Sequence, residues 1–526
     1  MSANPQNLPE ITDQLIALLG AEHVLLEPAD REFYAMDVYN AREVPMAVVQ
    51  PGSVEDVQAV ARIASAAGVA MVPRGGGASY TDGYLPTTAR SVIIDTGRLN
   101  RILEVNAEDM YVTVEPGITW ADLTAKLAEQ GLRTAFWGPF SGLKATVGGS
   151  MSQNAVSLGS GNYGCSAETA LSFEVVIASG ELVRTGSAAL DTASPFFRWY
   201  GPDLTGLFTG DAGALGIKAR ITLRLIPAPS HHATASFGFE DYYSMAAGMS
   251  AAARTGVVAD CFGLDPKLQQ GQLGSTSTKD AMQAVWAVLK TSTNPIDGLV
   301  RVSKMAAAGK RFLSGFDYSS HYVVEGSTRA EVNAKLAQVR GAMGGHGTEI
   351  ANTIPTVLRA MPFIPLYPIL GPRGQRWVPM HGILPFSRLR QFHDGINKVY
   401  ADYAERMVQH KVEKAAMFTS ISTNAMLYEP VFYWEDDRTA FHKRYLPQEY
   451  LDVLPEYPAN PEGRALVKEM KAAIQEVFTA TGATHMQVGK AYPYQRSRHP
   501  ESARVLRDLK ASVDPQGLMN PGALGL

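Results

Sequence analysis

The segment from Val72 to Tyr80 carries three consecutive glycines, Gly75–Gly77, directly after a predicted strand. Glycines let the backbone approach a ligand closely and point its N–H groups at it, as the binding of a pyrophosphate requires. The spacing is not GxGxxG, and no Lys-Ser/Thr pair follows. The segment therefore matches neither a nicotinamide-dinucleotide fingerprint nor a nucleoside-triphosphate loop. For this run taken alone, a flexible turn is the alternative.

Two further stretches of small residues follow in the same region. One is Thr146–Ser150 together with Gly159–Gly164, and the other is Gly210–Ile217. Each stretch lies beside a predicted strand, so all three can converge on one extended ligand. Ordinary turns in a glycine-rich α/β domain are the competing interpretation.

Side chains suited to proton transfer come from both halves of the chain. Tyr80 can hydrogen-bond a substrate hydroxyl; the alternative is a ring packed against the sheet. His381, in the segment Trp377–Ile383, suits a base because histidine titrates near neutral pH. The alternative for His381 is a buried histidine bonded to backbone. Further candidates of the same kind are His485, Tyr428, Tyr492 and Tyr494.

The second half of the chain also carries charged and aromatic runs, and most of them allow two interpretations. Arg373 and Arg376 can bind a substrate carboxylate through paired hydrogen bonds, although a solvated loop fits the same residues. The run Met361–Tyr367 predicts either the wall of an apolar pocket or core. The acidic run Glu435–Asp437 predicts a surface turn.

Alternating strand and helix signals over the first 230 residues predict the elements that position the glycine loops. A capping box at Ser53–Asp56 opens a helix that ends at Gly68, and a strand over 69–72 runs into the first glycine loop. The other predicted elements are strands over 91–95, 111–115 and 217–226, a helix after Thr119, and a hairpin over 173–184.

A second region shows the strand–helix–strand signals of an α+β sheet domain. A strand over 315–325 precedes a helix capped by Thr328 with Glu331, and two more strands are predicted over 417–421 and 427–434. The boundary between the two regions is predicted near 230–240. The turn-rich tail over 514–522 is expected to pack back on the body.

Composition excludes several classes of protein. The chain has 526 residues and a net charge of −4, without a basic block, so we expect no nucleic-acid partner. Its two cysteines cannot build a disulfide framework or a zinc cluster, which suits a reducing cytoplasm. No signal-peptide pattern and no apolar run of membrane-spanning length is present, so a cytoplasmic protein without a membrane span is expected.

The order of these segments resembles the FAD-binding half of the vanillyl-alcohol oxidase/p-cresol methylhydroxylase (VAO/PCMH) flavoprotein superfamily. The matching segments are Pro73–Tyr80, Asn100–Asn106, Val114–Thr119, Val147–Gly149, Tyr163–Gly164, Gly213–Ile217 and the closing motif within Asp514–Gly522. The resemblance covers essentially the whole chain and implies a two-domain α+β fold. It implies an FAD-binding α+β domain over 1–232, a substrate (cap) domain with an antiparallel sheet over 233–485, and a C-terminal segment over 486–526 that packs back on the FAD domain.

The resemblance also implies where the cofactor binds. In the family, the first glycine loop wraps the pyrophosphate of FAD, and the second runs along the flavin ring. The residues that this assigns to FAD are Pro73, Arg74, Gly75, Gly76, Gly77, Ala78, Ser79, Pro116, Gly117, Ser141, Thr146, Gly148, Gly149, Tyr163, Gly164, Gly216 and Ile217.

The chain departs from the family pattern at several positions. The family's phenol oxidases attach FAD through a histidine after a Trp-Val-Pro motif; here Ile383 stands at that position and His381 two residues earlier. Other branches use a histidine in the first glycine loop, which has none here, so we predict non-covalent FAD. Ser141 stands where the phenol oxidases place an acid near flavin N5, and Gly482–Ala483 stand where they hold a phenolate. The metal motif of the family's hydroxy-acid dehydrogenases is missing, so no metal is expected.

The resemblance implies an FAD-dependent oxidase or dehydrogenase. We expect a hydride to pass from a small aromatic alcohol or benzylic carbon to flavin N5, while a tyrosine or histidine assists loss of the hydroxyl proton. Reduced flavin would pass its electrons to dioxygen or a redox partner, and a homodimer is among the expected assemblies. The assigned catalytic residues are Tyr80, His381 and His485, and the assigned substrate residues are Arg373, Arg376, Trp377, Tyr428 and Tyr494.

Two other functions stay open at this stage. One is a 2-hydroxy-acid dehydrogenase of the lactate or glycolate type, which would use Arg373 or Arg376. The other is a flavoprotein with non-redox turnover or none, because Ser141 stands where an acid is expected.

Overall fold

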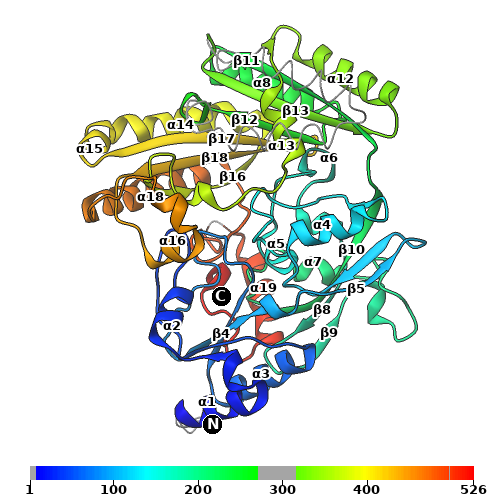
Figure 1. The fold of residues 1–526 in the computed structure, drawn as a ribbon, viewed down its shortest axis with the longest axis vertical. Helices are drawn as coiled ribbons and strands as arrows, with labels where there is room; N and C mark the ends of the chain where they lie inside the picture. The colour runs from blue at the N-terminus through cyan, green and yellow to red at the C-terminus, as the bar shows by residue number, and fades with distance from the viewer. Residues whose placement is uncertain (1–7, 270–314, 497) are drawn as a thin grey trace.

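The computed structural model describes residues 8–269, 315–496 and 498–526, and three β-sheets organise this part of the chain (Figure 1). The first two sheets use strands up to Pro227, and the third uses strands from His231 onward. Among the helices of the described residues, none combines the length and the apolar character that crossing a bilayer would take.

The first sheet carries the first glycine loop. Its strands run in the order β1 (Val24–Leu25), β2 (Ala47–Val49), β4 (Ser91–Asp95), β3 (Ala70–Arg74), and β2 and β3 are both parallel to β4. Helix α3 (Val54–Ala66) connects β2 to β3 and begins with the predicted capping box between Ser53 and Asp56. Its apolar stripe is buried against the sheet, as its helical spacing predicts.

The second sheet is antiparallel and carries the other two loops. Its order is β5 (Ile102–Asn106), β6 (Tyr111–Val114), β10 (Ile217–Pro227), β8 (Ala170–Val176), β9 (Leu182–Arg184), and β7 (Leu132–Thr134) also pairs with β10. The predicted hairpin over 173–184 is the β8–β9 pair. Helices α4 (Trp120–Ala128) and α5 (Val147–Gln153) pack on this sheet around Trp120, Leu123 and Met151.

The third sheet is antiparallel throughout and forms the upper part of the molecule in Figure 1. Its order is β14 (Thr348–Ile350), β11 (His231–Phe239), β13 (Tyr318–Gly326), β12 (Asp260–Leu264), β17 (Val412–Ile421), β18 (Ala425–Trp434), β15 (Arg376–Pro379), and β16 (Gly382–Pro385) pairs with β18. Helices α8 (Tyr242–Ala253), α12 (Arg329–Met343), α14 (Leu389–Asp402) and α18 (Pro461–Thr481) pack on one face of it.

The other face of the third sheet is joined to the second sheet by buried polar contacts. Arg133 of β7 donates two hydrogen bonds to Glu325 of β13, at 2.7 and 2.9 Å. Arg359 of α13 (Thr353–Ala360) lies 2.7 Å from the same carboxylate. The N–H of Gly159 donates to Asp260 of β12 at 2.6 Å. These contacts fix the distance between the third sheet and the glycine loops.

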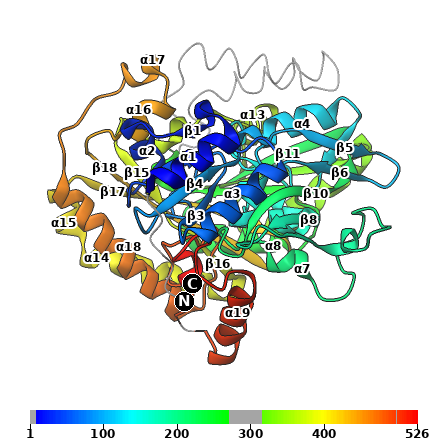
Figure 2. The same ribbon diagram turned by 90° about the horizontal axis from the view of Figure 1, so that it is seen from below.

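The C-terminal segment returns to the first sheet. Helix α19 (Pro500–Val513) precedes a tail that pairs with β3, where Met71 donates to the carbonyl of Leu518 and accepts from the N–H of Asn520, both at 2.7 Å. In Figures 1 and 2 this segment, in red, lies beside the strands of the N-terminal part. Residues more than four hundred positions apart in sequence therefore form one layer.

Candidate active site

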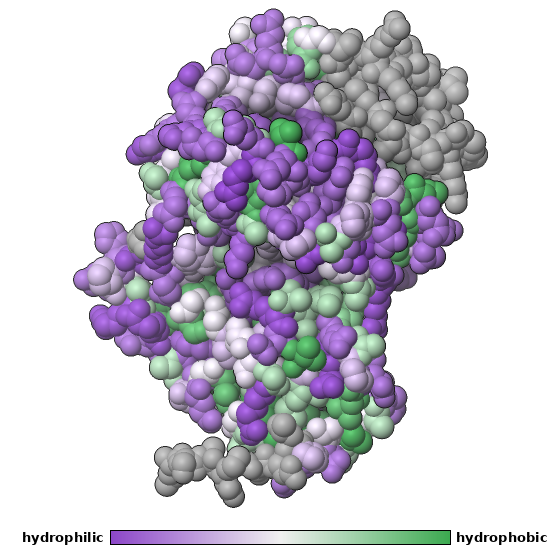
Figure 3. All heavy atoms as spheres, turned by 90° about the vertical axis from the view of Figure 1, so that its left-hand side faces the viewer, coloured by the Kyte–Doolittle hydropathy of each residue, from purple (hydrophilic) through white to green (hydrophobic). Residues whose placement is uncertain are grey.

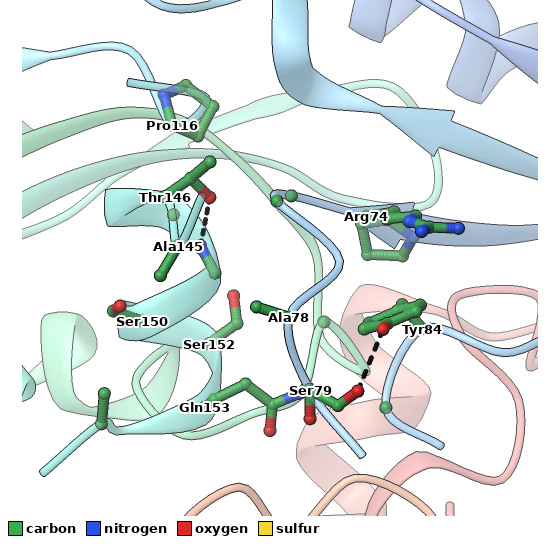
Figure 4. Close-up of a pocket in the computed structure, with 18 of the residues that line it drawn as sticks. Arg74, Ala78, Ser79, Tyr84, Pro116, Ala145, Thr146, Ser150, Ser152 and Gln153 are labelled. Carbon is green, nitrogen blue, oxygen red and sulfur yellow. Dashed lines mark hydrogen bonds between the residues drawn. The ribbon is translucent and has the colours of Figure 1, made fainter. Parts of the chain in front are cut away.

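A cavity of about 970 Å³, counted with its open mouth, lies where the three glycine-containing stretches meet (Figure 4). In cavities that hold cofactors, the polar groups come from a few converging loops, as they do here. The lining residues are Pro73–Ser79, Gly83, Tyr84, Thr96, Pro116, Pro139, Ser141, Ala145, Thr146, Gly148–Ser150, Ser152, Gln153, Ala155, Val156, Ala212, Gly213, Gly216–Lys218 and Gln487.

The first glycine loop has bonded carbonyls and free N–H groups. The carbonyl oxygen of Gly76 accepts a hydrogen bond from Tyr445 at 2.9 Å, and that of Gly77 accepts one from Tyr84 at 2.8 Å. Within the described residues, none of the N–H groups over 76–79 donates a backbone hydrogen bond. Successive unpartnered N–H groups form a nest that attracts an anion. The loop is therefore suited to phosphate oxygens.

Two of the glycines are required by close packing between the loops. A Cβ on Gly76 would overlap the carbonyl oxygen of Lys144, and a Cβ on Gly148 would overlap Pro116. The first loop consequently lies directly against the loop before α5. Because glycine has no side chain to fill the space between the loops, the backbone itself forms the cavity wall.

Arg74 borders the cavity, but its guanidinium is turned away from α5 (Figure 4). It lies 4.4 Å from the ring centre of Tyr34 and 4.8 Å from that of Tyr84, and it donates to the carbonyl of Tyr34 at 3.2 Å. The structure thus gives Arg74 the role of anchoring the first glycine loop from behind.

Asn520 holds two edges of the cavity together. Its amide donates to the carbonyl of Gly83 at 2.7 Å and to that of Ala212 at 2.6 Å, and both of these residues line the cavity. Lys490 donates to the side-chain oxygen of Asn520 at 2.5 Å. Burial lowers the pKa of Lys490 to about 7, and Arg42 adds to this. One buried amide therefore fixes the third stretch relative to the chain that follows the first stretch.

Tyr80, His381 and Glu429 form a cluster beside the cavity. The Tyr80 hydroxyl lies 2.8 Å from Nε2 of His381, and a carboxylate oxygen of Glu429 lies 3.2 Å from the same nitrogen. Nδ1 of His381 has no hydrogen-bond partner among the described residues. A buried N–H without an acceptor is costly, so the tautomer with its hydrogen on Nε2 is favoured. In that tautomer the Nε2–H of His381 points toward the Tyr80 hydroxyl oxygen and the Glu429 carboxylate oxygen.

The three members of this cluster differ in their access to the cavity. His381 is 0% exposed and Glu429 is 9% exposed, whereas Tyr80 is only half-buried. Gln487, which lines the cavity, accepts a hydrogen bond from Ser79 at 3.1 Å and lies 3.5 Å from the Tyr80 oxygen. Of the three, Tyr80 is thus the most accessible and Glu429 keeps a small exposed fraction, whereas His381 has none; all three lie beside the cavity lining rather than in it.

Residues of the C-terminal part hold the backbone of His381. The N–H of His381 donates to the hydroxyl of Tyr492 at 2.6 Å, and its carbonyl accepts from Nδ1 of His485, also at 2.6 Å. The rings of His485 and Tyr492 stack with centres 4.1 Å apart. Burial lowers the pKa of His485. His485 therefore enters the cluster as a neutral donor to backbone.

The register of the third sheet decides which other side chains share the face of Glu429. Met417 of β17 lies directly opposite Glu429 on β18, so both point to the same side. Trp377 lies opposite Tyr433, four residues beyond Glu429 on β18, and its ring meets that of Tyr80 edge to face at 5.2 Å. The wall around the cluster is consequently aromatic and apolar apart from Glu429.

The other residues assigned to substrate lie away from the cluster. Arg373 is exposed and pairs with Glu413 at 2.8 Å. Arg376 is buried, so the solvated loop expected there is wrong for this residue; it donates to the carbonyls of Tyr39 and Asp437. Tyr428 points to the helical face of the sheet, where its hydroxyl lies 2.9 Å from His393. Tyr494 packs under Arg498 at 3.7 Å.

Most of the residues assigned to FAD line the cavity, with three exceptions. Gly117 lies behind the wall, because a Cβ there would overlap the carbonyl of Thr96. Tyr163 and Gly164 close the short helix α6 (Ser160–Tyr163), which packs against β17 and β12 of the third sheet. Their segment supports the joint between the two halves.

Sequence reasoning missed Glu429 and misjudged Asp436. Glu429 is the one charged residue in the apolar run 425–434, and that isolation is the signal by which it could have been found. The expectation of a surface turn over 435–437 is wrong for Asp436, which is fully buried. Asp436 accepts from Trp434 at 2.9 Å and from Arg464, so it fixes the end of β18.

Comparisons with known proteins agree with a cofactor cavity in this region. Residues 45–186 match the family model described as FAD binding domain. The chain is 33% identical over 224 residues to glycolate oxidase subunit GlcD of Bacillus subtilis, which covers 42% of the chain and 45% of that protein. It is 32% identical over 233 residues to the mitochondrial D-lactate dehydrogenase [cytochrome] of Arabidopsis thaliana, covering 44% of the chain and 39% of that protein. The match therefore spans less than half the length of either relative.

A solved structure is similar over the whole chain. The crystal structure of p-cresol methylhydroxylase with substrate bound superposes with a TM-score of 0.76 at 20% sequence identity, covering 100% of this chain and 98% of that one. The likeness establishes the two-part α+β fold, in which a glycine-rich half faces an antiparallel sheet.

Proposed function

We propose that the chain belongs to the VAO/PCMH superfamily of FAD-binding flavoproteins and that it is an FAD-dependent oxidoreductase acting on a small neutral alcohol or benzylic carbon; the match to an FAD binding domain and the likeness in fold support this. The observation that carries the proposal is the cluster of Tyr80, His381 and Glu429 beside the cofactor cavity. When bound, FAD accepts the hydride; the protein must orient the substrate and manage the hydroxyl proton.

The cavity suits FAD in shape and in polarity. The free N–H groups over 76–79 would bind the pyrophosphate, and the backbone wall around Gly148 leaves room for an extended dinucleotide. Ile383 contacts an apolar cluster with Leu427 and Met486 and offers no nucleophile, while the His381 ring is fully buried. Both observations support non-covalent binding.

The cluster divides the proton chemistry between two side chains. The Tyr80 oxygen accepts from His381, which leaves its O–H to donate to the substrate oxygen. Burial raises the pKa of Tyr80 well above its usual value, and Glu429 adds to this, so Tyr80 stays protonated and acts as a donor. The Glu429 carboxylate, oriented by His381, is the base that accepts the hydroxyl proton. His381 does not contact the substrate in this scheme; it positions Tyr80 and Glu429.

The charge of the wall favours a neutral aromatic substrate. Glu429 is the charged group on this face of β18, and Trp377, Tyr80 and Met417 surround it with apolar surface. A substrate carboxylate would meet Glu429 without a compensating cation, and burying unpaired like charges is costly.

A 2-hydroxy acid is the second candidate substrate, because both curated relatives are named for hydroxy-acid oxidation. Against it, the Arg376 guanidinium is bonded to backbone carbonyls and Arg373 to Glu413. A flavoprotein without redox turnover is the third candidate, since Ser141 lines the cavity where an acid was expected.

Three further parts of the proposal concern the electron acceptor, the assembly and the cellular location. They are dioxygen or a redox protein as electron acceptor, a homodimeric assembly and a cytoplasmic location. The domain division at 232/233 and 485/486 also stays a proposal; the change of sheet between Pro227 and His231 supports a boundary near the first of these positions.

Steady-state turnover of vanillyl-type alcohols, D-lactate and glycolate tests the proposal. We expect oxidation of the aromatic alcohols, and we expect Glu429→Gln to lower kcat by roughly 100-fold or more at unchanged FAD content. Glu405→Gln, an exposed position in the same half, is the matched control and should leave kcat unchanged. Preferential turnover of D-lactate, or full activity of Glu429→Gln, would overturn the proposal.

A further inference from the structure

Tyr445 donates a hydrogen bond to the first glycine loop, although it belongs to the half of the chain that carries the third sheet. It is the last residue of α16 (Ala440–Tyr445) and lies 369 positions after Gly76, to whose carbonyl its hydroxyl donates at 2.9 Å. The Tyr445 oxygen also accepts a hydrogen bond from Arg74 at 3.3 Å. Tyr445 does not line the cavity, so its hydroxyl meets the loop from outside.

Aromatic packing holds the Tyr445 ring in place. The ring stacks on Phe33 of α2 (Pro28–Tyr34) with the ring centres 5.5 Å apart, and on Phe441 of its own helix at 4.4 Å. Phe33 and Phe441 are both buried, and their rings stack on each other as well. The direction of the Tyr445 hydroxyl is therefore set by packing that does not involve a cofactor.

Helix α16 is also fixed on α2 by charge. Arg444 forms an ion pair with Asp30 at 2.7 Å, and its guanidinium lies over the ring of Phe33 at 4.2 Å. Figure 1 shows α16 directly above α2 on the left-hand side of the molecule. Figure 3 shows this side from outside, with hydrophobic residues in separate groups among hydrophilic ones. The stacked rings thus form an internal contact between the two halves of the chain.

The hydrogen bond from Tyr445 determines where one N–H group of the loop points. In a planar trans peptide, the C=O group and the N–H group that follows it point in opposite directions. The peptide between Gly76 and Gly77 is trans, and its carbonyl is turned toward Tyr445. The N–H of Gly77 is consequently turned away from Tyr445. Among the described residues it donates no backbone hydrogen bond, and Gly77 lines the cavity.

The conformation of Gly77 is matched to the position of Tyr445. Its φ of +68° is left-handed, as in the nests whose successive N–H groups bind anions. A Cβ on Gly77 would overlap the Tyr445 hydroxyl and the guanidinium of Arg74. The hydroxyl therefore occupies the space that a side chain at this position would need. Because Arg74 donates to the same oxygen, it polarises the phenol and strengthens its bond to the Gly76 carbonyl.

We propose that Tyr445 is a positioning residue for the pyrophosphate of FAD and acts through the peptide between Gly76 and Gly77. Its hydroxyl holds this peptide in the orientation in which the Gly77 N–H donates to a phosphate oxygen. Part of the FAD affinity is then supplied by the half of the chain that carries the third sheet. Without the hydroxyl, the peptide is ordered only when the cofactor binds, and that ordering lowers the affinity. The inference rests on the proposed binding of FAD but on no particular substrate.

Tyr445→Phe tests the proposal, because it removes the hydroxyl and keeps the ring that stacks on Phe33 and Phe441. We expect the dissociation constant of FAD from the full-length holoprotein, measured by the fluorescence of released flavin, to rise about 10-fold. Tyr457→Phe is the matched control. The Tyr457 hydroxyl also donates to a backbone carbonyl, that of Arg373 at 2.8 Å, and neither residue lines the cavity. This control should leave the FAD affinity unchanged.

Phosphorus NMR of the bound cofactor separates a role at the pyrophosphate from a role in packing. We expect Tyr445→Phe to shift a phosphate resonance of bound FAD, and Tyr457→Phe to shift none. Far-UV circular dichroism establishes that both variants are folded. Phosphate resonances that stay in place in Tyr445→Phe, or an unchanged dissociation constant, would overturn the role of Tyr445 and leave the proposed function intact. Natural protein that binds no FAD would overturn the proposed function and this inference with it.

Discussion

The hydroxyl oxygen of Tyr80 lies 2.8 Å from Nε2 of His381, although 301 positions separate the two residues in the sequence. Tyr80 follows the first glycine loop, and His381 lies between β15 and β16 of the third sheet. The hydrogen bond therefore joins the half that forms the cofactor cavity to the half that covers it, at the point where a substrate would lie.

Tyr80 and His381 should act as one unit in turnover. Tyr80→Phe removes the donor to the substrate oxygen, and His381→Asn removes the group that orients both Tyr80 and Glu429, so we expect each to lower kcat by about 10- to 100-fold. The double variant should be little worse than the worse single variant, with a coupling of about 1–3 kcal/mol in a double-mutant cycle. Independent, additive losses would separate the two residues functionally.

FAD should leave the protein on acid precipitation. Ile383 offers no nucleophile at the family's attachment position, and the buried His381 ring is engaged by Tyr80 and Glu429. We predict a colourless pellet and a yellow supernatant after trichloroacetic acid treatment. A yellow pellet would mean that another side chain is bonded to the flavin.

Asn520 should be needed for tight FAD binding, although it lies outside the cavity lining. Asn520→Ala removes the two hydrogen bonds that hold the carbonyls of Gly83 and Ala212, so the third stretch and the chain that follows the first stretch lose their common anchor. We expect the dissociation constant of FAD, measured by flavin fluorescence, to rise about 10-fold or more. Gln495→Ala removes a single amide bond to Leu524 in the same C-terminal part and serves as control. Equal affinities would show that the anchor is dispensable.

The buried Glu325 carboxylate should contribute stability that depends on pH. Burial alone would raise its pKa, but Arg359 and Arg133 outweigh burial and lower the pKa to about 2. A lowered folded-state pKa gives stability that is complete above the unfolded value of about 4.5 and lost as pH falls toward 2. Glu325→Gln should therefore cost about 3–5 kcal/mol at pH 7, measured by urea unfolding.

Urea unfolding of the natural sequence and of Glu325→Gln at lower pH tests whether the ion pairs of Glu325 are the cause. The difference between the natural sequence and Glu325→Gln should shrink steadily between pH 4.5 and 2 and stay constant between pH 6 and 8. A quadruple variant with Arg133→Met, Arg359→Met, Glu325→Leu and Asp260→Asn should recover much of the loss, because neither the arginines nor the two neighbouring carboxylates are then left buried without a partner. A pH-independent difference would point to packing as the cause.

Much of the fold follows from local patterns that the sequence states clearly. The capping box at Ser53 and the apolar stripe of α3 predict that helix, and the three glycine stretches predict a shared cavity. These signals are visible because each depends on residues close together in the chain. The pairing of Met71 with Leu518 could be expected only in outline, because it depends on a contact between the two ends of the sequence.

Two members of the site were predictable, but the third member and the arrangement of all three were not. Tyr80 and His381 could be singled out by type and context, whereas Glu429 joins them through the register of β17, β18 and β15, which the sequence leaves open. Arg376 shows the converse case. Its residue type suggests carboxylate binding, but in the folded protein its guanidinium donates to the backbone carbonyls of Tyr39 and Asp437.

Anaerobic mixing of the holoprotein with an aromatic alcohol, followed at the flavin absorbance band, tests the central claim most directly. That claim is that the glycine loops hold FAD where Tyr80 and Glu429 can activate a neutral alcohol. We predict rapid bleaching with a vanillyl-type alcohol, bleaching at least about 100-fold slower with Glu429→Gln, and none with D-lactate. Purified protein that stays colourless after incubation with FAD, or flavin that is bleached by D-lactate and not by the alcohol, would contradict it.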